Sequence, residues 1–174
     1  MKTTPLLTVI LFVLTCTGFS CDGKPTAAQQ STLDTEVSAR VIVVLSDYEK
    51  MRAALAQDRH SDVAGIATEL DTSVKAAAQG APAKVADRLN EMAKAALTMA
   101  PEKNTETQRK VFGDLSRAAV SLLLDHPSLT KGRHIFHCPM AQGYPKWIQT
   151  DGEMKNPYMG KRMLRCGTKS EWKL

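Results

Sequence analysis

Apolar residues recur every three or four positions along four stretches between residues 34 and 126, and this spacing limits the possible folds more than any other feature. Residues three and four apart share one face of an α-helix, so each stretch predicts an amphipathic helix. Gly80, Pro101 and Pro127 end the second, third and fourth stretches. We expect helices over about 34–57, from 61 or 62 to about 80, 82–100 and 105–126.

Local signals support these predicted helix starts. Ser61 or Asp62 is suited to cap the second helix, and Pro82 suits the first turn of the third because proline lacks the N–H that would go unpaired there. Thr105 and Gln108 have the spacing of a capping box for the fourth helix. Four helices with short links predict a mainly α fold, an antiparallel four-helix bundle.

After Pro127 the helical periodicity stops and glycine becomes frequent. Runs at 133–137, 146–150 and 162–166 predict short strands separated by turns. We therefore expect one domain over 34–174 that ends in a small Cys/Met-rich β or irregular knob, residues 131–174. About forty residues hold too little core alone, so a disulfide or a metal should stabilise the knob, with Trp147 and Tyr158 anchoring its core.

The first residues are typical of a targeting segment. Lys2 precedes a short apolar run from Leu6 to Phe19, so residues 1–20 are interpreted as a lipoprotein-type signal peptide. Gly18-Phe19-Ser20-Cys21 resembles a lipobox, which predicts lipidation of Cys21. The small and polar residues 21–33 predict a flexible tether. We expect a periplasmic protein anchored by lipid to a bacterial membrane, with ordinary secretion as the alternative.

Export determines how the cysteines are interpreted. Cys16 would leave with the signal peptide and Cys21 would carry lipid, so Cys138 and Cys166 remain. In an oxidising compartment such a pair forms a disulfide or binds a metal. A disulfide would close a loop of about 28 residues and stabilise the fold by about 3–4 kcal/mol. The sequence leaves both alternatives open, together with a third in which the thiols switch as a redox sensor.

The knob also gathers soft metal donors. Thiolate and thioether sulfur select soft ions such as Cu(I), and imidazole also binds copper. Structural zinc is disfavoured because the cysteines lack a close Cys-x2-Cys spacing. We predict a site for Cu(I), or for silver as a related soft ion, and place Met154 and Met159 at a secondary site. The predicted ligands are Cys138, Met140, Met163, Cys166 and His137.

Charge and missing motifs exclude other functions. Residues 131–174 hold nine Lys and Arg against three Asp and Glu, a net charge of +6. No aromatic-rich or arginine-rich reading motif accompanies these charges, so we expect no nucleic-acid partner and interpret them as a solvated face. The sequence shows no nucleophile–base pair, phosphate loop or paired carboxylates, so we do not expect an enzyme.

A further set of motifs is Tyr48, Leu55-Ala56-x-Asp58, Arg109-x-x-Phe112-x-x-Leu115-Ser116, Cys138-Pro139-Met140-Ala141, Trp147-Ile148-Gln149, Asn156-Pro157-Tyr158-x-Gly160 and Met163-Leu164-x-Cys166-Gly167. Together these motifs resemble a known family, the domain-of-unknown-function family numbered 3347, over about residues 36–170. Members occur as small exported proteins, often lipoproteins, and as the carboxy-terminal part of periplasmic adaptor subunits of copper/silver efflux pumps. The resemblance therefore implies a copper-handling role carried by Cys138, Met140, Met163 and Cys166, with heavy-metal efflux components as partners. The alternative is a disulfide-stapled structural or interaction domain, without metal, that partners an efflux or envelope complex.

Overall fold

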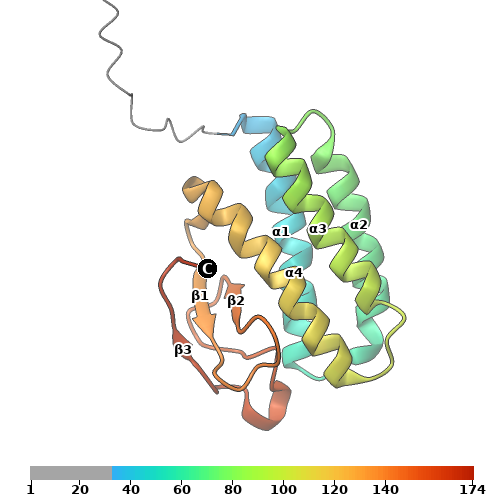
Figure 1. Ribbon diagram of the computed structural model, residues 1–174, viewed down its shortest axis with the longest axis vertical. Helices are drawn as coiled ribbons and strands as arrows, with labels where there is room; N and C mark the ends of the chain where they lie inside the picture. Colours follow the sequence, from blue (N-terminus) through green and yellow to red (C-terminus); the bar gives the residue numbers. More distant parts are fainter. Residues whose placement is uncertain (1–32) are drawn as a thin grey trace, which may run out of the picture.

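The computed structural model describes residues 33–174, in which four α-helices precede a small three-stranded sheet (Figure 1). The predicted signal peptide 1–20, the lipidation site Cys21 and nearly all of the tether 21–33 lie outside these residues. The protein is mainly helical, as predicted. None of the helices described is both long enough and apolar enough to cross a membrane. The helices are α1 (Thr35–Ala56), α2 (Val63–Ala78), α3 (Ala83–Met99) and α4 (Thr105–Asp125).

The predicted helix positions are confirmed, but two predicted caps do not form as expected. Asp62 stands at the cap position of α2, yet its side chain makes no capping hydrogen bond and instead accepts from Arg59 and Ser61.

The capping box expected at Thr105 and Gln108 does not form. Instead Asn104 caps α4, and its side-chain oxygen accepts hydrogen bonds from the backbone N–H groups of Glu106 and Thr107 at 2.8 and 3.1 Å. An asparagine one position earlier already satisfies the free donors of the first turn, so Thr105 becomes the first helical residue.

The helices pack in chain order, α1 on α2, α2 on α3 and α3 on α4. Figure 1 shows α1, α2 and α3 side by side, with α4 between them and the C-terminal knob. The predicted inward positions of α4, Phe112, Leu115 and Leu122, are fully buried. The apolar stripe of each helix therefore forms the core, as its periodicity predicted.

The knob holds a three-stranded antiparallel sheet in the order β2-β1-β3. The strands expected at 133–137 and 146–150 are confirmed as β1 (His134–His137) and β2 (Lys146–Gln149). The strand expected at 162–166 is wrong. A 3-10 turn, η3 (Gly160–Met163), takes its place, and pairing resumes only at β3 (Thr168–Lys169). Gly160 at φ +61° and Gly167 at φ +135° turn the chain here, which breaks an extended strand.

The core of the knob is continuous with the core of the helices. Trp147 and Tyr158 are buried with ring centroids 5.9 Å apart, as expected of anchors. The Tyr158 ring also packs on Phe112 of α4 at 5.6 Å, and Phe112 stacks on Tyr48 of α1 at 5.6 Å. Aromatic pairs of this kind stabilise by about 0.5–1.5 kcal/mol each beyond the area they bury. Packing onto α1 and α4 thus supplies the core that the knob lacks alone.

A buried hydroxyl also joins the knob to two helices. Tyr48 Oη lies 2.7 Å from Ser116 Oγ and accepts a hydrogen bond from the Ile148 backbone N–H at 3.1 Å. Replacing Tyr48 by phenylalanine leaves that N–H without its acceptor, so we expect a loss of about 1–3 kcal/mol of unfolding free energy in urea denaturation. Tyr144→Phe is the control, because the buried Tyr144 hydroxyl has no partner among residues 33–174. Equal losses in both variants would contradict this role.

Candidate functional site

Three sulfur-bearing side chains meet just beyond the end of β1. Cys166 Sγ lies 3.8 Å from Met140 Sδ, and Cys138 lies near enough to Cys166 to raise the pKa of its thiol. Both cysteines are free. Cys138 is fully buried, Cys166 is half-buried and Met140 is 55% exposed. This sulfur cluster, Cys138, Met140 and Cys166, therefore runs from the core to the surface.

A turn after β1 positions the first two members of the cluster. The Cys138 backbone N–H donates to the Pro145 carbonyl at 2.9 Å, which holds the thiol beside the sheet. The Ala141 N–H then donates to the Cys138 carbonyl at 3.3 Å and closes a turn over the residues between them. The turn leaves Met140 at the surface while Cys138 remains in the core.

Asn156 positions the third member. Its side-chain Nδ2 donates to the Cys166 carbonyl at 2.5 Å, and its backbone N–H donates to the Leu164 carbonyl at 2.8 Å. Its Oδ1 accepts from the N–H groups of Tyr158 and Met159 at 2.8 and 3.1 Å. Asn156 is fully buried, so these hydrogen bonds are shielded from water. One amide side chain thus fixes both the turn after Asn156 and the backbone of Cys166.

Gly167 allows this segment to lie close against β1. A Cβ atom on Gly167 would lie 2.5 Å from the His137 carbonyl oxygen, and its φ of +135° is one that side chains rarely allow. Only glycine therefore permits the approach that brings Cys166 beside Cys138. The same Cβ position lies 3.3 Å from Met154 Sδ. A fourth sulfur atom, that of Met154, thus packs next to the cluster.

The loop that carries Met154 is organised by Gln149 at the end of β2. Gln149 Oε1 accepts hydrogen bonds from Trp147 Nε1 at 3.0 Å and from the Lys155 backbone N–H at 3.1 Å. Its Nε2 donates to the carbonyls of Asp151 and Glu153, both at 2.6 Å. Gln149 is fully buried and uses both ends of its amide within one loop. The side chain therefore fixes the backbone on both sides of Met154.

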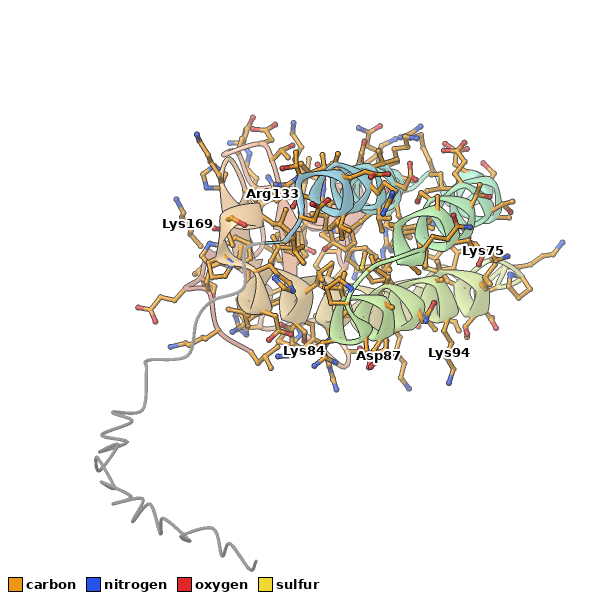
Figure 2. All side chains as sticks on the ribbon, turned by 90° about the horizontal axis from the view of Figure 1, so that it is seen from above. Lys75, Lys84, Asp87, Lys94, Arg133 and Lys169 are labelled. Carbon is orange, nitrogen blue, oxygen red and sulfur yellow. The ribbon has the colours of Figure 1, made fainter. Side chains whose placement is uncertain are left out.

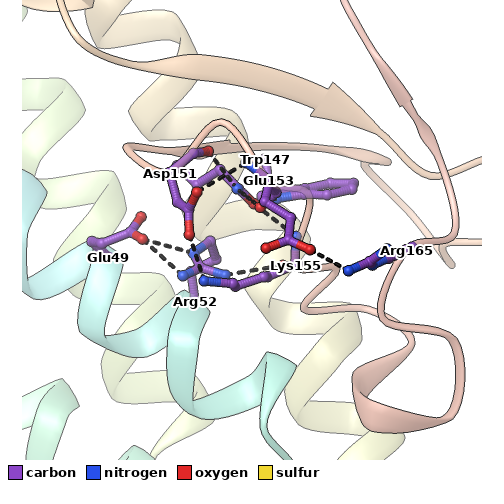
Figure 3. Close-up of polar contacts among 8 residues, drawn as sticks. Glu49, Arg52, Trp147, Asp151, Glu153, Lys155 and Arg165 are labelled. Atoms are coloured by element: carbon purple, nitrogen blue, oxygen red, sulfur yellow. Dashed lines mark hydrogen bonds and ion pairs between the residues drawn. The ribbon is translucent and has the colours of Figure 1, made fainter.

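A hydrogen bond ties the same loop to α1, and an ion pair ties it to the Cys166 segment (Figure 3). Arg52 of α1 donates to the Lys155 carbonyl at 2.9 Å and pairs with Glu49 at 2.8 Å. Burial raises the pKa of the Glu49 carboxyl, and the hydrogen bond from Arg52 opposes that rise. Glu153 pairs with Arg165, the residue before Cys166. The helices, the Met154 loop and the Cys166 segment are thus joined around the cluster.

The other two predicted ligands lie beside the cluster. Met163 ends η3, is 38% exposed, and its carbonyl accepts the Cys166 backbone N–H at 3.0 Å. His137 is half-buried and immediately precedes Cys138, with Lys146 and Thr168 as its neighbours on the flanking strands. The contacts described above bring together Cys138, Met140 and Cys166. Met154 was expected only at a secondary site, because no local motif links it to either cysteine.

The surroundings of Cys166 favour the protonated form of its thiol. Burial raises the pKa of the Cys166 thiol, and the charge and hydrogen bond of the neighbouring Cys138 raise it further. A metal ion that binds thiolates would displace the proton from Cys166. Among residues 33–174 no group of three or more His, Cys, Asp or Glu gathers as metal ligands. A metal site at this cluster would therefore include thioether sulfur.

The fold and the cluster define a small, mainly helical domain with a sulfur-containing sheet knob at its C-terminal end. Residues 44–128 match the family model described as "Protein of unknown function (DUF3347)", which confirms the resemblance to that family. The match runs from within α1 to just after α4, so the whole sulfur cluster lies beyond it. Searches of the curated proteins and of the solved structures found no match to the chain.

Proposed function

We propose that the protein is a periplasmic module that binds Cu(I), or silver as a related soft ion, and sequesters it or passes it on. The ion binds at the sulfur cluster, and the protein catalyses no bond chemistry. The four helices form an antiparallel bundle that carries the knob. Lipid on Cys21 and the tether 21–33 hold the module at a bacterial membrane, where heavy-metal efflux components are its partners.

The observation that carries this proposal is the 3.8 Å approach of the Cys166 and Met140 sulfur atoms, with Cys138 as a close neighbour of Cys166. These residues are far apart in the sequence, yet three soft donors converge where one of them, Met140, is 55% exposed. Thiolate and thioether ligands favour Cu(I) over the harder divalent ions. The arrangement therefore supports reversible binding of a soft ion near the surface.

The cluster also suggests an order of ligand exchange. The exposed Met140 meets an incoming ion first, and the ion then passes to Cys166 and to the buried Cys138. Each step replaces one sulfur ligand by another while copper stays in the +1 state, and the thiol protons leave to solvent. Met154 and Met163 are the two candidates for a fourth ligand position. The Met154 sulfur lies beside Gly167, the residue after Cys166, and the Met163 carbonyl accepts the Cys166 backbone N–H.

A methionine series tests this ligand set. Anaerobic titration of the reduced protein with Cu(I) against a competing chelator measures the affinity. We expect Met154→Leu to lower it about tenfold, because leucine fills similar space but offers no sulfur donor. Met92→Leu in the core of α3 is the control and should bind like the wild type. A loss in Met163→Leu, with none in Met154→Leu, would assign the fourth position to Met163.

A further inference from the structure

A hollow of about 210 Å³ opens beside the exposed member of the sulfur cluster. The start of α4 contributes one wall, and the segments around Met140 and η3 contribute the other. Met140 lines this hollow while its sulfur lies 3.8 Å from Cys166 Sγ. The hollow is therefore a surface that a partner's side chain would enter to reach the cluster.

The charge at this hollow is net positive, although Glu106 also lines it and offsets part of that charge. Arg109 is already used, because it pairs with Asp58 at 2.5 Å and donates to the Pro157 carbonyl at 3.1 Å. Lys110 and Arg162 also line the hollow, and neither forms an ion pair within residues 33–174. The hollow thus has two cations without an ion pair, Lys110 and Arg162, beside the exposed thioether, against the single carboxylate of Glu106.

The rest of the knob adds to this field. Its three acidic residues each lie in an ion pair within the knob, Asp151 with Lys155, Glu153 with Arg165 and Glu171 with Lys173. These pairs use three of the nine basic residues of the knob, so residues 131–174 keep a net charge of +6. An uneven field of this kind steers oppositely charged partners and raises association rates roughly 10- to 1000-fold.

We propose that this hollow is the docking surface for an acidic protein that exchanges a soft metal ion with the cluster. The inference rests on the proposed function and names the kind of partner it requires. Acidic side chains of the partner meet Lys110 and Arg162, and a sulfur ligand of the partner enters beside Met140. Cu(I) then passes from one sulfur to the next without a change of oxidation state.

The shape of the hollow favours a protein over other anionic partners. A lipid surface is broad and would meet the rim cations without filling a concave site beside Met140. Single-stranded nucleic acid needs exposed aromatic faces on which bases stack, whereas Tyr158, the aromatic residue of this hollow, is only 6% exposed. A folded acidic surface with a projecting side chain fits both the charge and the cavity.

Two synthetic peptides serve as probes. One carries two methionines flanked by glutamates, the other has lysines in place of the glutamates, and both are loaded with Cu(I). In stopped-flow transfer at low salt we expect the wild type to take copper at least about tenfold faster from the acidic peptide. The difference should shrink as salt screens the charges. Lys110→Glu/Arg162→Glu should abolish it while leaving the equilibrium affinity for Cu(I) unchanged.

The matched control is Lys75→Glu/Lys94→Glu, which makes the same change in net charge on α2 and α3. Figure 2 shows these two lysines toward the end of the molecule opposite Lys169 of the knob. This control should keep the fast transfer. Retention of the rate difference in Lys110→Glu/Arg162→Glu would overturn the proposal.

Two further measurements distinguish a failure of the docking surface from a failure of copper binding, and a protein partner from a lipid surface. Association of the metal-free acidic peptide, followed by fluorescence anisotropy, tests docking even if the protein does not bind copper. The docking surface is supported if that association is lost in Lys110→Glu/Arg162→Glu and kept in Lys75→Glu/Lys94→Glu. Sedimentation with phosphatidylglycerol vesicles tests the membrane instead. Vesicle binding that needs Lys110 and Arg162, together with equal transfer from both peptides, would overturn the protein partner in favour of lipid.

Discussion

Replacing Cys166 by serine is expected to lower the affinity for Cu(I) more than about 100-fold, the largest effect of any single change at the cluster. Cys166 is the member that lies close to both of the others, with its sulfur 3.8 Å from that of Met140 and with Cys138 near enough to raise its pKa. Serine offers a hard oxygen donor of lower affinity for a soft ion. Anaerobic titration of the reduced protein against a chelator measures the change.

Cys166 tests the site better than Cys138 does. Cys138 is fully buried, so its replacement disturbs the core, whereas Cys166 is half-buried and its serine variant should keep the fold. Thr168→Ser, on the exposed strand β3, is the control and should bind Cu(I) like the wild type. Circular dichroism and urea unfolding confirm that both variants are folded. Wild-type affinity in Cys166→Ser would end the proposal that this cluster holds the ion.

The helical part of the fold was predictable from sequence because its information is local. In α1 and α4 the residues at helical spacing, such as Val41, Tyr48 and Leu115, are the ones that pack into the core. Burial follows directly from that periodicity. The cap of α4 was less predictable, because Asn104 and Thr105 both have suitable side chains and only the backbone geometry selects one.

The knob was harder to predict because long-range contacts determine it. Gln149 and Asn156 are fully buried amides whose hydrogen bonds shape separate loops, and their types alone do not reveal those partners. The prediction of a strand over 162–166 failed because Gly160, with its positive φ, starts a turn there. Met154 reaches Gly167 only because its loop folds back over thirteen residues of chain. The sequence therefore indicated that cysteine and methionine sulfur atoms gather in the knob, but not which methionines lie at the cluster.

A second large effect is expected at Gly160, which lies where α1, α4 and the knob meet. Asp58 pairs with Arg109 at 2.5 Å and accepts the Lys161 backbone N–H at 3.2 Å. A Cβ atom on Gly160 would overlap both the Asp58 carboxylate and the Arg109 guanidinium, and Gly160 has φ +61°. We expect Gly160→Ala to lower the unfolding free energy by about 3 kcal/mol, from displaced packing and a left-handed backbone.

Gly132→Ala isolates the backbone contribution to that loss. Gly132 has a similar φ of +72°, but a Cβ atom there would meet nothing within 4 Å. Its cost should therefore be only the left-handed conformation, about 1 kcal/mol. Urea denaturation of both variants gives the difference, which measures how strongly the Asp58–Arg109 pair holds the knob. Equal losses would mean that this pair moves aside without cost and does not hold Gly160 in place.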